Sequence, residues 1–221
     1  MAGRLDFDWL APAASALADG AATTVILVAV TTLFGGALSV AAAAARRGRL
    51  AWLRGLVAAY VELIRNTPFI VQLFFIFFGL PGIGVRLNAM PAAILAMTIN
   101  LAAYGTEIVR AGLDAVTAGQ REAGLALGLR PTAVFLRIVL PQALRAIYPA
   151  LVSQIVITML ESAVVSQIAV RDLTYEADLM QSRTFLSFET YAVVTLIYLA
   201  LAVLLRRVLN AGGRRLGLVP G

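Results

Sequence analysis

Residues 122–141 read EAGLALGLRPTAVFLRIVLP and lie between long hydrophobic runs. The segment suits two short helices, because Gly128 can end a helix over residues 120–127 in a left-handed conformation and Pro131 fits the first turn of the next helix. Two short helices joined at a glycine make a compact knob. The sequence therefore predicts a helical knob at about residues 119–141, on a chain whose other long segments are apolar.

The composition places this chain in a membrane. Its 221 residues are 61% hydrophobic and 14% charged, with a mean hydropathy of +0.88, whereas soluble domains are about half apolar and about a quarter charged. Cysteine, histidine and lysine are absent, which excludes thiol and histidine chemistry, Schiff bases and the lysine of nucleotide-binding loops. We therefore expect an all-α integral membrane protein that is not an enzyme, holds no metal or cofactor, and leaves any ATP to another chain.

Five hydrophobic runs are long enough to cross a bilayer, for which about 20 apolar residues suffice. They predict a single transmembrane domain over residues 1–221, with spans at about 21–45, 56–80, 91–112, 142–170 and 189–208. Residues 171–189 form a mixed-charge connection between the last two spans.

The arginines predict the orientation of these spans. They are concentrated after the first span, around the knob and after the last span, and they are sparse at the N-terminus, near Arg86 and in the 171–189 connection. The two groups alternate as five spans require. Because basic loops stay in the cytoplasm, we expect the N-terminus outside, the C-terminus inside and the knob in the cytoplasm. The net charge of +6 then reflects orientation rather than a nucleic-acid site.

Two segments resemble a known family. Glu122-Ala123-Gly124, followed by Gly128, resembles the EAA loop of the membrane permeases of bacterial ABC importers. The segment YVELIRNTPFIVQL at residues 60–73 resembles the E-x-x-R-G-T-P-x-x-V-Q pattern of their polar amino acid branch, with Asn66 where glycine is usual. With residues 103–110 and 119–123, the resemblance runs from about residue 20 to about residue 205.

This resemblance implies the type I ABC importer permease fold, with five transmembrane helices, in the bacterial inner membrane. It implies as partners an ABC ATPase dimer that binds ATP and Mg²⁺, a second permease that is identical or related, and a periplasmic or other extracytoplasmic solute-binding protein. In the family the EAA loop docks on the ATPase. We therefore expect coupling to involve Glu122, Ala123, Gly124, Gly128 and Pro141. The alternative for Glu122 is that it only stabilises the first turn of the knob helix.

Pro68 lies inside the second hydrophobic run. Its ring removes a backbone hydrogen bond and permits a kink, which a membrane helix tolerates when neighbours satisfy the freed carbonyl. Thr67, Asn66 and Gln72 are close enough in sequence to do so. We expect structural roles for Thr67 and Pro68, and we also count Gln72 among the residues of the substrate pathway.

Two further polar sets lie in the second and third runs. Glu62 and Arg65 are three residues apart, and we favour an internal ion pair, with Arg65 structural, over direct substrate contact, although Glu62 stays a candidate for the pathway. Asn100, Tyr104 and Glu107 share one helical face at spacings of four and seven. Asn100 and Tyr104 either line the pathway or form helix–helix hydrogen bonds, and Glu107 can instead support the knob.

The fourth run holds the sharpest candidate for a substrate site. Gln154, Thr158 and Glu161 fall on one helical face, and Ser162 borders it. In the family this position commonly reads Lys-Asp, and here it is Leu160-Glu161. A carboxylate deep in an apolar helix needs a partner, so we expect Glu161 to hold a cationic or zwitterionic solute. The alternative is a helix-packing carboxylate that is protonated or paired with an arginine.

We therefore expect the permease subunit of an ABC importer for a polar amino acid, including a cationic one. An alternative with the same architecture is an importer of an amino-acid-like solute such as an opine or ectoine. A less favoured alternative is an ATP-independent secondary transporter, against which the lack of an inverted repeat argues.

Overall fold

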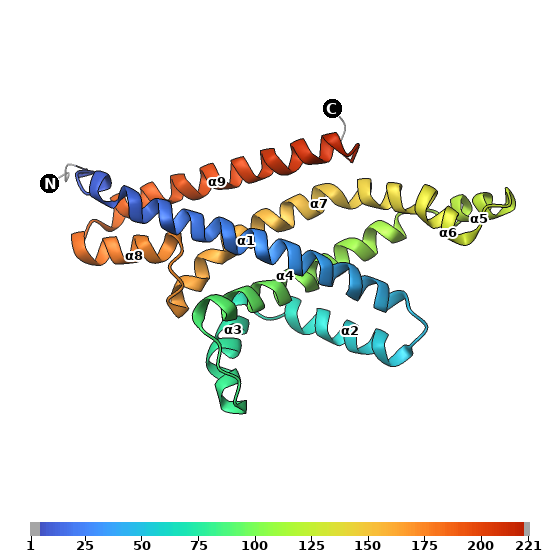
Figure 1. Cartoon of the computed structure of the whole chain (residues 1–221), viewed down its shortest axis with the longest axis horizontal. Helices are drawn as coiled ribbons and strands as arrows, with labels where there is room; N and C mark the ends of the chain where they lie inside the picture. The colour runs from blue at the N-terminus through green and yellow to red at the C-terminus, as the bar shows by residue number, and fades with distance from the viewer. Residues whose placement is uncertain (1–4, 219–221) are drawn as a thin grey trace.

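The computed structural model describes residues 5–218, and within that range it consists of helices and connections without strands. Figure 1 shows an elongated bundle in which the longest helices run roughly along one axis. The helices are α1 (Leu10–Arg47), α2 (Ala51–Arg65), α3 (Phe69–Phe74), α4 (Ala89–Asp114), α5 (Ala118–Ala126), α6 (Pro131–Val134), α7 (Leu140–Glu161), α8 (Leu173–Thr184) and α9 (Ser187–Arg215). Turns of π- or 3-10 helix extend three of them: η1 (Phe75–Gly79), η2 (Leu80–Ile83), η3 (Phe135–Val139) and η4 (Ser162–Ile168).

Four helical segments of the described chain are long and apolar enough to cross a membrane: Leu10–Arg47, Ala89–Asp114, Pro131–Ile168 and Ser187–Arg215. A fifth candidate is the pair formed by α2 and the segment Phe69–Ile83, which are bent by 111° relative to each other. The predicted all-helical membrane fold is confirmed. The second hydrophobic run is not one straight crossing, because the chain turns sharply at Pro68.

α1 and α4 pack closely because small residues face each other at their crossing. Gly105 of α4 lies against Ser39 of α1, and Gly35 of α1 lies against Leu101, where an added Cβ would come within 2.9 Å of Leu101 Cδ2. The Ser39 hydroxyl donates to Gly35 O at 2.7 Å. Small residues at crossings are typical of membrane helices, since close backbone contact replaces the hydrophobic driving force. α4 also contacts α2 and α7, so it lies at the centre of the bundle.

The mixed-charge connection forms a helix, α8, which the sequence analysis does not predict. The Asp172 side chain caps it by accepting a hydrogen bond from Tyr175 N at 2.9 Å. Gly20 lets α1 approach so closely that a Cβ there would lie 2.9 Å from Asp172 O. Leu173 N donates to Thr24 Oγ1 at 3.3 Å. Capping and contact with α1 therefore order a segment that hydrophobicity alone does not identify.

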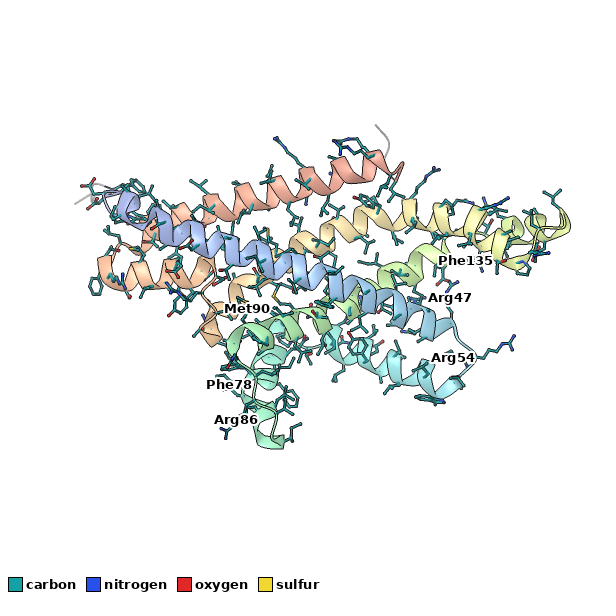
Figure 2. The ribbon with its side chains drawn as sticks, in the orientation of Figure 1. Arg47, Arg54, Phe78, Arg86, Met90 and Phe135 are labelled. Carbon is teal, nitrogen blue, oxygen red and sulfur yellow. The ribbon has the colours of Figure 1, made fainter. Side chains whose placement is uncertain are left out.

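α9 lies along the edge of the bundle (Figure 1) and packs mainly on α7 and α8. Two side chains tie it to the rest of the chain. The Tyr148 hydroxyl of α7 donates to Leu209 O at 2.5 Å, and Tyr198 lies 2.9 Å from the Thr174 hydroxyl of α8. Far from α9, the segment that follows α3 projects from the bundle and carries the labelled Phe78 and Arg86 in Figure 2.

Candidate functional site

The predicted knob is formed by α5, α6 and the turn between them. Gly128 has φ of +78°, and its N–H donates to Leu125 O at 2.9 Å while Leu129 N donates to Gly124 O at 3.2 Å. This pair of hydrogen bonds closes the C-terminus of α5 in the way that a left-handed glycine allows. α5 begins at Ala118, two residues before the predicted start, and Pro131 opens α6 as predicted.

The knob has one face that packs inward and one that is exposed. Gly124 is buried, and an added Cβ would come within 2.9 Å of Ile138 Cδ1 and 3.0 Å of Val134 Cγ2. The exposed face includes Glu122, Ala123, Leu125 and Leu127, and the Leu127 side chain is 82% exposed.

Pro141 follows a widened turn of helix. η3 is a π-helical turn over Phe135–Val139, and Pro141 lies in the first turn of α7 just after it. A π-turn accommodates a residue that cannot donate a backbone hydrogen bond, so the helical segment Pro131–Ile168 continues through the proline. Pro141 thus sits where the knob joins the membrane-spanning part of the helix.

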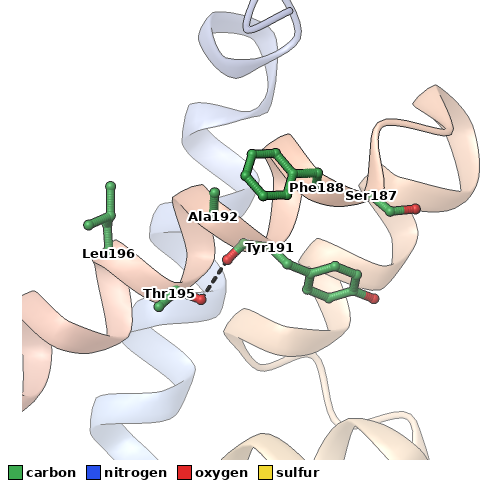
Figure 3. A pocket seen from close by; sticks show the side chains of 6 residues that line it. All are labelled: Ser187, Phe188, Tyr191, Ala192, Thr195 and Leu196. Atoms are coloured by element: carbon green, nitrogen blue, oxygen red, sulfur yellow. Dashed lines mark hydrogen bonds between the residues drawn. The ribbon is translucent and has the colours of Figure 1, made fainter. Parts of the chain in front are cut away.

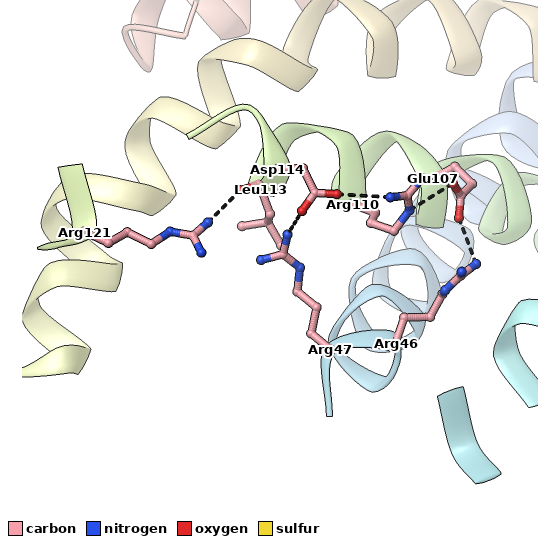
Figure 4. Close-up of polar contacts among 7 residues, drawn as sticks. All are labelled: Arg46, Arg47, Glu107, Arg110, Leu113, Asp114 and Arg121. Atoms are coloured by element: carbon pink, nitrogen blue, oxygen red, sulfur yellow. Dashed lines mark hydrogen bonds and ion pairs between the residues drawn. The ribbon is translucent and has the colours of Figure 1, made fainter. Parts of the chain in front are cut away.

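A network of charges holds α1 and α4 together next to the knob (Figure 4). Glu107 accepts from Arg46 at 3.1 Å and from Arg110 at 2.7 Å. Asp114 accepts from Arg110 at 3.0 Å and also pairs with Arg47. Glu107 is therefore held by two ion pairs near the knob end of the bundle, so a role in supporting the knob stays a prediction.

Arg121 joins the knob to α4 beside this network. Its guanidinium donates to Leu113 O, near the end of α4, at 2.8 Å (Figure 4). Sequence reasoning did not single out Arg46, Arg110, Asp114 or Arg121. The i, i+3 and i, i+4 spacing of Glu107, Arg110 and Asp114 was a signal within α4, but the contacts from α1 join residues more than 60 positions apart.

The break in the second run is closed by side chains. Pro68 cannot donate to Ile64 O, and the Gln72 side-chain amide donates to that carbonyl at 2.8 Å and to Thr67 O at 2.9 Å. The side-chain oxygen of Gln72, Oε1, accepts a hydrogen bond from Asn100 Nδ2 of α4 at 3.0 Å. Gln72 and Asn100 are both buried. The Gln72 amide and the Asn100 Nδ2 group are therefore engaged with each other and with the break, whereas Asn100 Oδ1 is buried without a hydrogen-bond partner in the described chain.

Glu62 and Arg65 do not form the predicted ion pair in the described part of the chain, so that prediction is wrong. Asn66 Nδ2 donates a hydrogen bond to a carboxylate oxygen of Glu62 at 3.0 Å. The Arg65 guanidinium lies over the Tyr104 ring, 5.4 Å from its centroid. Both Glu62 and Arg65 are exposed on this subunit. The two side chains leave α2 toward different neighbours, which i, i+3 spacing alone does not decide.

A cavity of about 380 Å³ lies between the end of α2, α4 and α7. Arg65, Tyr104, Glu107 and Gln154 supply its polar lining, and two isoleucines together with alanines and Gly112 supply the rest. Glu107 is neutralised by its two arginines, whereas Arg65 has no carboxylate partner among residues 5–218. The cavity therefore offers one free cationic group beside an aromatic ring and an amide.

The predicted face of the fourth run is divided between packing and this cavity. Gln154 is 8% exposed and borders the cavity, whereas Thr158 and Ser162 are buried, and Ser162 Oγ donates to Met159 O at 2.6 Å. Glu161 ends α7 half-buried, and its carboxylate has no hydrogen bond or ion pair within the described chain. Glu161 lies seven residues from Gln154, which is about 10 Å along a helix.

A depression on α9 lies apart from these groups (Figure 3). All of its lining residues come from that single helix, between Ser187 and Leu196. Its one hydrogen bond among the residues drawn runs from Thr195 Oγ1 to Tyr191 O at 2.7 Å, within the helix. This surface brings no second element to a ligand, so it is not a candidate site.

Comparison with known proteins agrees with this geometry. Residues 35–217 match the family described as "Binding-protein-dependent transport system inner membrane component". The probable glutamine ABC transporter permease protein GlnM of Bacillus subtilis (strain 168) is 39% identical over 151 residues, which are 68% of this chain and 70% of that protein. The arginine transport system permease protein ArtQ of the same organism is 35% identical, covering 71% of this chain and 72% of that protein.

Solved structures show the same architecture. A chain from a structure described as an amino acid ABC transporter with histidines has a TM-score of 0.89 and 32% identity, covering 96% of this chain and 100% of that one. A chain of the MetNI methionine ABC transporter has a TM-score of 0.69 at 24% identity, covering 95% and 99%, and this likeness concerns the fold alone.

Proposed function

This chain belongs to the family of binding-protein-dependent transport system inner membrane components and is the permease subunit of an amino acid ABC importer, and we propose that it carries a zwitterionic or cationic amino acid between Arg65 and Glu161. The observation that supports this most is that the described chain leaves one cation in the cavity and one carboxylate farther along α7 without a partner of opposite charge. Arg65 lines the cavity together with Gln154, and Glu161 follows on the same face of α7.

The chemistry of an amino acid fits these two groups. An α-carboxylate would pair with the Arg65 guanidinium, which matches carboxylates in two parallel hydrogen bonds. An α-ammonium group, or a guanidinium side chain, would pair with Glu161, whose burial in the membrane makes a charged partner favourable. The separation of about 10 Å between Gln154 and Glu161 along α7 favours an extended, cationic amino acid over a short one.

The test is uptake into proteoliposomes that contain this permease with its ATPase and solute-binding protein. Labelled arginine, glutamine and cystine are the probes, since relatives are named for these substrates. We expect Glu161→Gln to weaken uptake of the cationic probe about tenfold or more, because losing about 1.4 kcal/mol of charge pairing is tenfold in affinity. Leu160→Ala, whose side chain is exposed on the same turn, is the matched control. Unchanged affinity and specificity in both Glu161→Gln and Glu161→Ala would overturn the role of Glu161.

We further propose that the exposed face of the knob binds a separate ATPase dimer, which holds ATP and Mg²⁺. Glu122, Ala123 and Leu127 are exposed there, while Gly124 fits the knob against the start of the long helix and Gly128 sets its turn. The contact would transmit closure of the ATPases to α4 through Arg121 and to α7 through Pro141. A second permease subunit and an extracytoplasmic solute-binding protein complete the proposed importer.

Two knob variants test this coupling. Gly128→Val forces a β-branched residue into a left-handed conformation that costs about 1–3 kcal/mol, and Glu122→Ala removes an exposed charge without disturbing packing. We expect transport-linked ATP hydrolysis to fall in both, while capture of substrate by the binding protein is unchanged. Gly119→Ala is the control, because a Cβ there meets nothing within 4 Å. Normal coupling in a folded Gly128→Val variant would contradict the proposal.

The proposed orientation places the knob in the cytoplasm and the N-terminus outside. It is supported by arginine density around the knob and after α9. The chain lacks cysteine, so single cysteines report sidedness directly. Leu127→Cys and Ile83→Cys place thiols at positions that are 82% and 76% exposed. In intact cells, an impermeant thiol reagent should label only Ile83→Cys, and the reverse pattern would invert the topology.

A further inference from the structure

An apolar groove runs between α9 and the neighbouring helices α1 and α7. Its volume is about 340 Å³, and it lies between Val25 and Ala29 of α1, Ile155 of α7, and Leu205 and Val208 of α9. This volume is at the lower end of the range of ligand pockets, about 300–1,000 Å³. Thr32 is the one polar side chain that lines it.

The chemistry of the lining excludes a polar occupant. An amino acid in this groove would lose its hydration and find almost no hydrogen-bonding partner, which is unfavourable by several kcal/mol. The groove lies along a helix that is long and apolar enough to span a membrane, and Val208 on its wall is 59% exposed. A hydrocarbon chain is the occupant that such a groove favours.

Arginines follow the groove at one end. The Tyr148 hydroxyl of α7 donates a hydrogen bond to Leu209 O of α9. Beyond it, Arg145 Nε donates to Gly217 O at 3.0 Å, which brings that guanidinium next to the end of α9. Arg215 lies two turns beyond Val208 on the same helical face, because seven residues make about two turns.

Gly212 connects the groove to these arginines. It lies on the groove face one turn beyond Val208, and a Cβ added there would meet nothing within 4 Å. The surface of α9 is therefore open at Gly212. A chain in the groove can pass Gly212 toward the end of α9, where Arg215 lies on the same face and Arg145 contacts Gly217 O.

The positive charge at this end is not neutralised by the described part of the chain. Residues 123–160 and 190–221 contain no aspartate or glutamate. The nearby carboxylates of Glu107 and Asp114 are engaged by the arginines of α1 and α4. An anionic ligand would neutralise the arginines at this end of α7 and α9.

A second copy of this chain is a poor occupant of the same groove. Two copies in one membrane share their orientation, so a two-fold axis along the membrane normal would bring two such arginine-rich ends together at the same depth. Like charges brought together in this way disfavour the contact. A lipid with an anionic headgroup satisfies both the groove and the arginines.

We propose that this groove is a binding site for an anionic phospholipid, with one acyl chain between α1, α7 and α9 and the phosphate beside Arg145 and Arg215. The site is distinct from the amino acid route between α2, α4 and α7, and it does not depend on which amino acid is carried. Bound there, the lipid would fill the space between α9 and the bundle.

The charge half of the site is tested on the transporter purified with its partner subunits in mild detergent. Phosphatidylglycerol and phosphatidylcholine with identical acyl chains are added, and bound lipid is measured by native mass spectrometry. The wild type should prefer phosphatidylglycerol. Each arginine near an anionic lipid contributes about 1 kcal/mol, about fivefold, so Arg145→Gln with Arg215→Gln should reduce its binding about thirtyfold.

The matched control for charge is Arg206→Gln with Arg207→Gln, which makes the same charge change on other faces of α9. This pair should leave the preference for phosphatidylglycerol nearly unchanged. Equal losses in the two double variants would show only a general attraction to the basic end and would overturn the site. Equal binding of the two lipids by the wild type would overturn it as well.

The groove half is tested by filling it. Ala29→Phe and Leu205→Phe each place a ring where the acyl chain would lie, and each should displace phosphatidylglycerol, whereas Leu199→Phe on another face of α9 should not. Retention of the lipid in both groove variants would overturn the placement of the chain. A disulfide between two Val208→Cys copies, formed in native membranes, would show that a second subunit occupies the groove and would also overturn it.

Discussion

Replacing Gln72 with leucine tests whether this side chain closes the break at Pro68 or lines the substrate pathway. From sequence, Gln72 is a candidate both for closing the Pro68 break and for lining the substrate pathway. The structure shows its side-chain amide donating to Ile64 O and Thr67 O and accepting from Asn100 at the break. Leucine has a similar volume but no polar group. Gln72→Leu therefore removes the hydrogen bonds that close the break while it keeps the packing.

The size of the effect follows from what is left unpaired. A buried group without its partner costs about 1–3 kcal/mol. Ile64 O keeps only long contacts from Thr67, at 3.3 and 3.4 Å, so we assign about 2 kcal/mol to the two carbonyls together. The lost bond with Asn100 adds about 0.6–1.7 kcal/mol, the range measured between membrane helices. Gln72→Leu should thus lower the free energy of unfolding by about 2–4 kcal/mol.

The assay is reversible unfolding in mixed micelles of detergent and SDS, followed by circular dichroism. Val71→Leu, at an exposed neighbouring position, is the control and should stay within about 0.5 kcal/mol of the wild type. A double-mutant cycle with Asn100→Leu should give the coupling of about 0.6–1.7 kcal/mol. A loss below about 0.5 kcal/mol, together with an altered substrate affinity, would refute the structural role and favour the pathway role.

Two further predictions concern packing and pH. Gly112→Val should prevent stable assembly of α4 with α7, because a Cβ at Gly112 would overlap Ile147 Cγ2, whereas Gly36→Ala, where a Cβ meets nothing within 4 Å, should be neutral; yields and melting temperatures of the purified variants decide this. Burial raises the pKa of Asp172, which lies outside the membrane-spanning helices, from 3.8 to about 6. Because the raised pKa lies in the folded state, protonation stabilises the fold. This protonation contributes up to about 3 kcal/mol to the free energy of unfolding, at about 1.4 kcal/mol per pKa unit. The contribution is fully present below about pH 4 and is lost as the pH rises through about 6. Asp172→Asn should remove this part of the pH dependence of unfolding, and an unchanged pH profile would contradict the burial of that carboxyl group.

Much of the architecture could be predicted from local sequence. Hydrophobic runs identify the spanning helices because length and apolarity are properties of a continuous segment. The turn of the knob was also predictable, since glycine permits the left-handed conformation that Gly128 adopts and the ring of Pro131 fixes its backbone at a helix start. Similarly, the freed carbonyl at Pro68 follows from the ring itself, and the side chains near it in sequence included the one that satisfies it, Gln72.

Other features depend on residues that are distant in the chain. The i, i+3 spacing of Glu62 and Arg65 permits an ion pair, but α4 places the Tyr104 ring under Arg65. Neither the contact of Gln72 with Asn100 nor the pairing of Arg46 with Glu107 has a signal in local sequence. α8 is ordered by a cap and by Gly20 of α1, not by its own hydrophobicity.

The sequence by itself determined that this chain crosses a membrane, roughly where its long apolar helices lie and that it carries a glycine-hinged knob, because these depend on the solvent preference and backbone freedom of consecutive residues. Only the tertiary structure decided which polar groups satisfy one another and which stay free. Arg65 and Glu161 remain without a partner of opposite charge in the described chain, whereas Gln72 bonds to Asn100 and Glu107 pairs with two arginines. That difference arises because hydrogen bonds and ion pairs form between whichever groups the helix crossings bring within about 3 Å, and the crossings are set by the packing of small residues far apart in sequence.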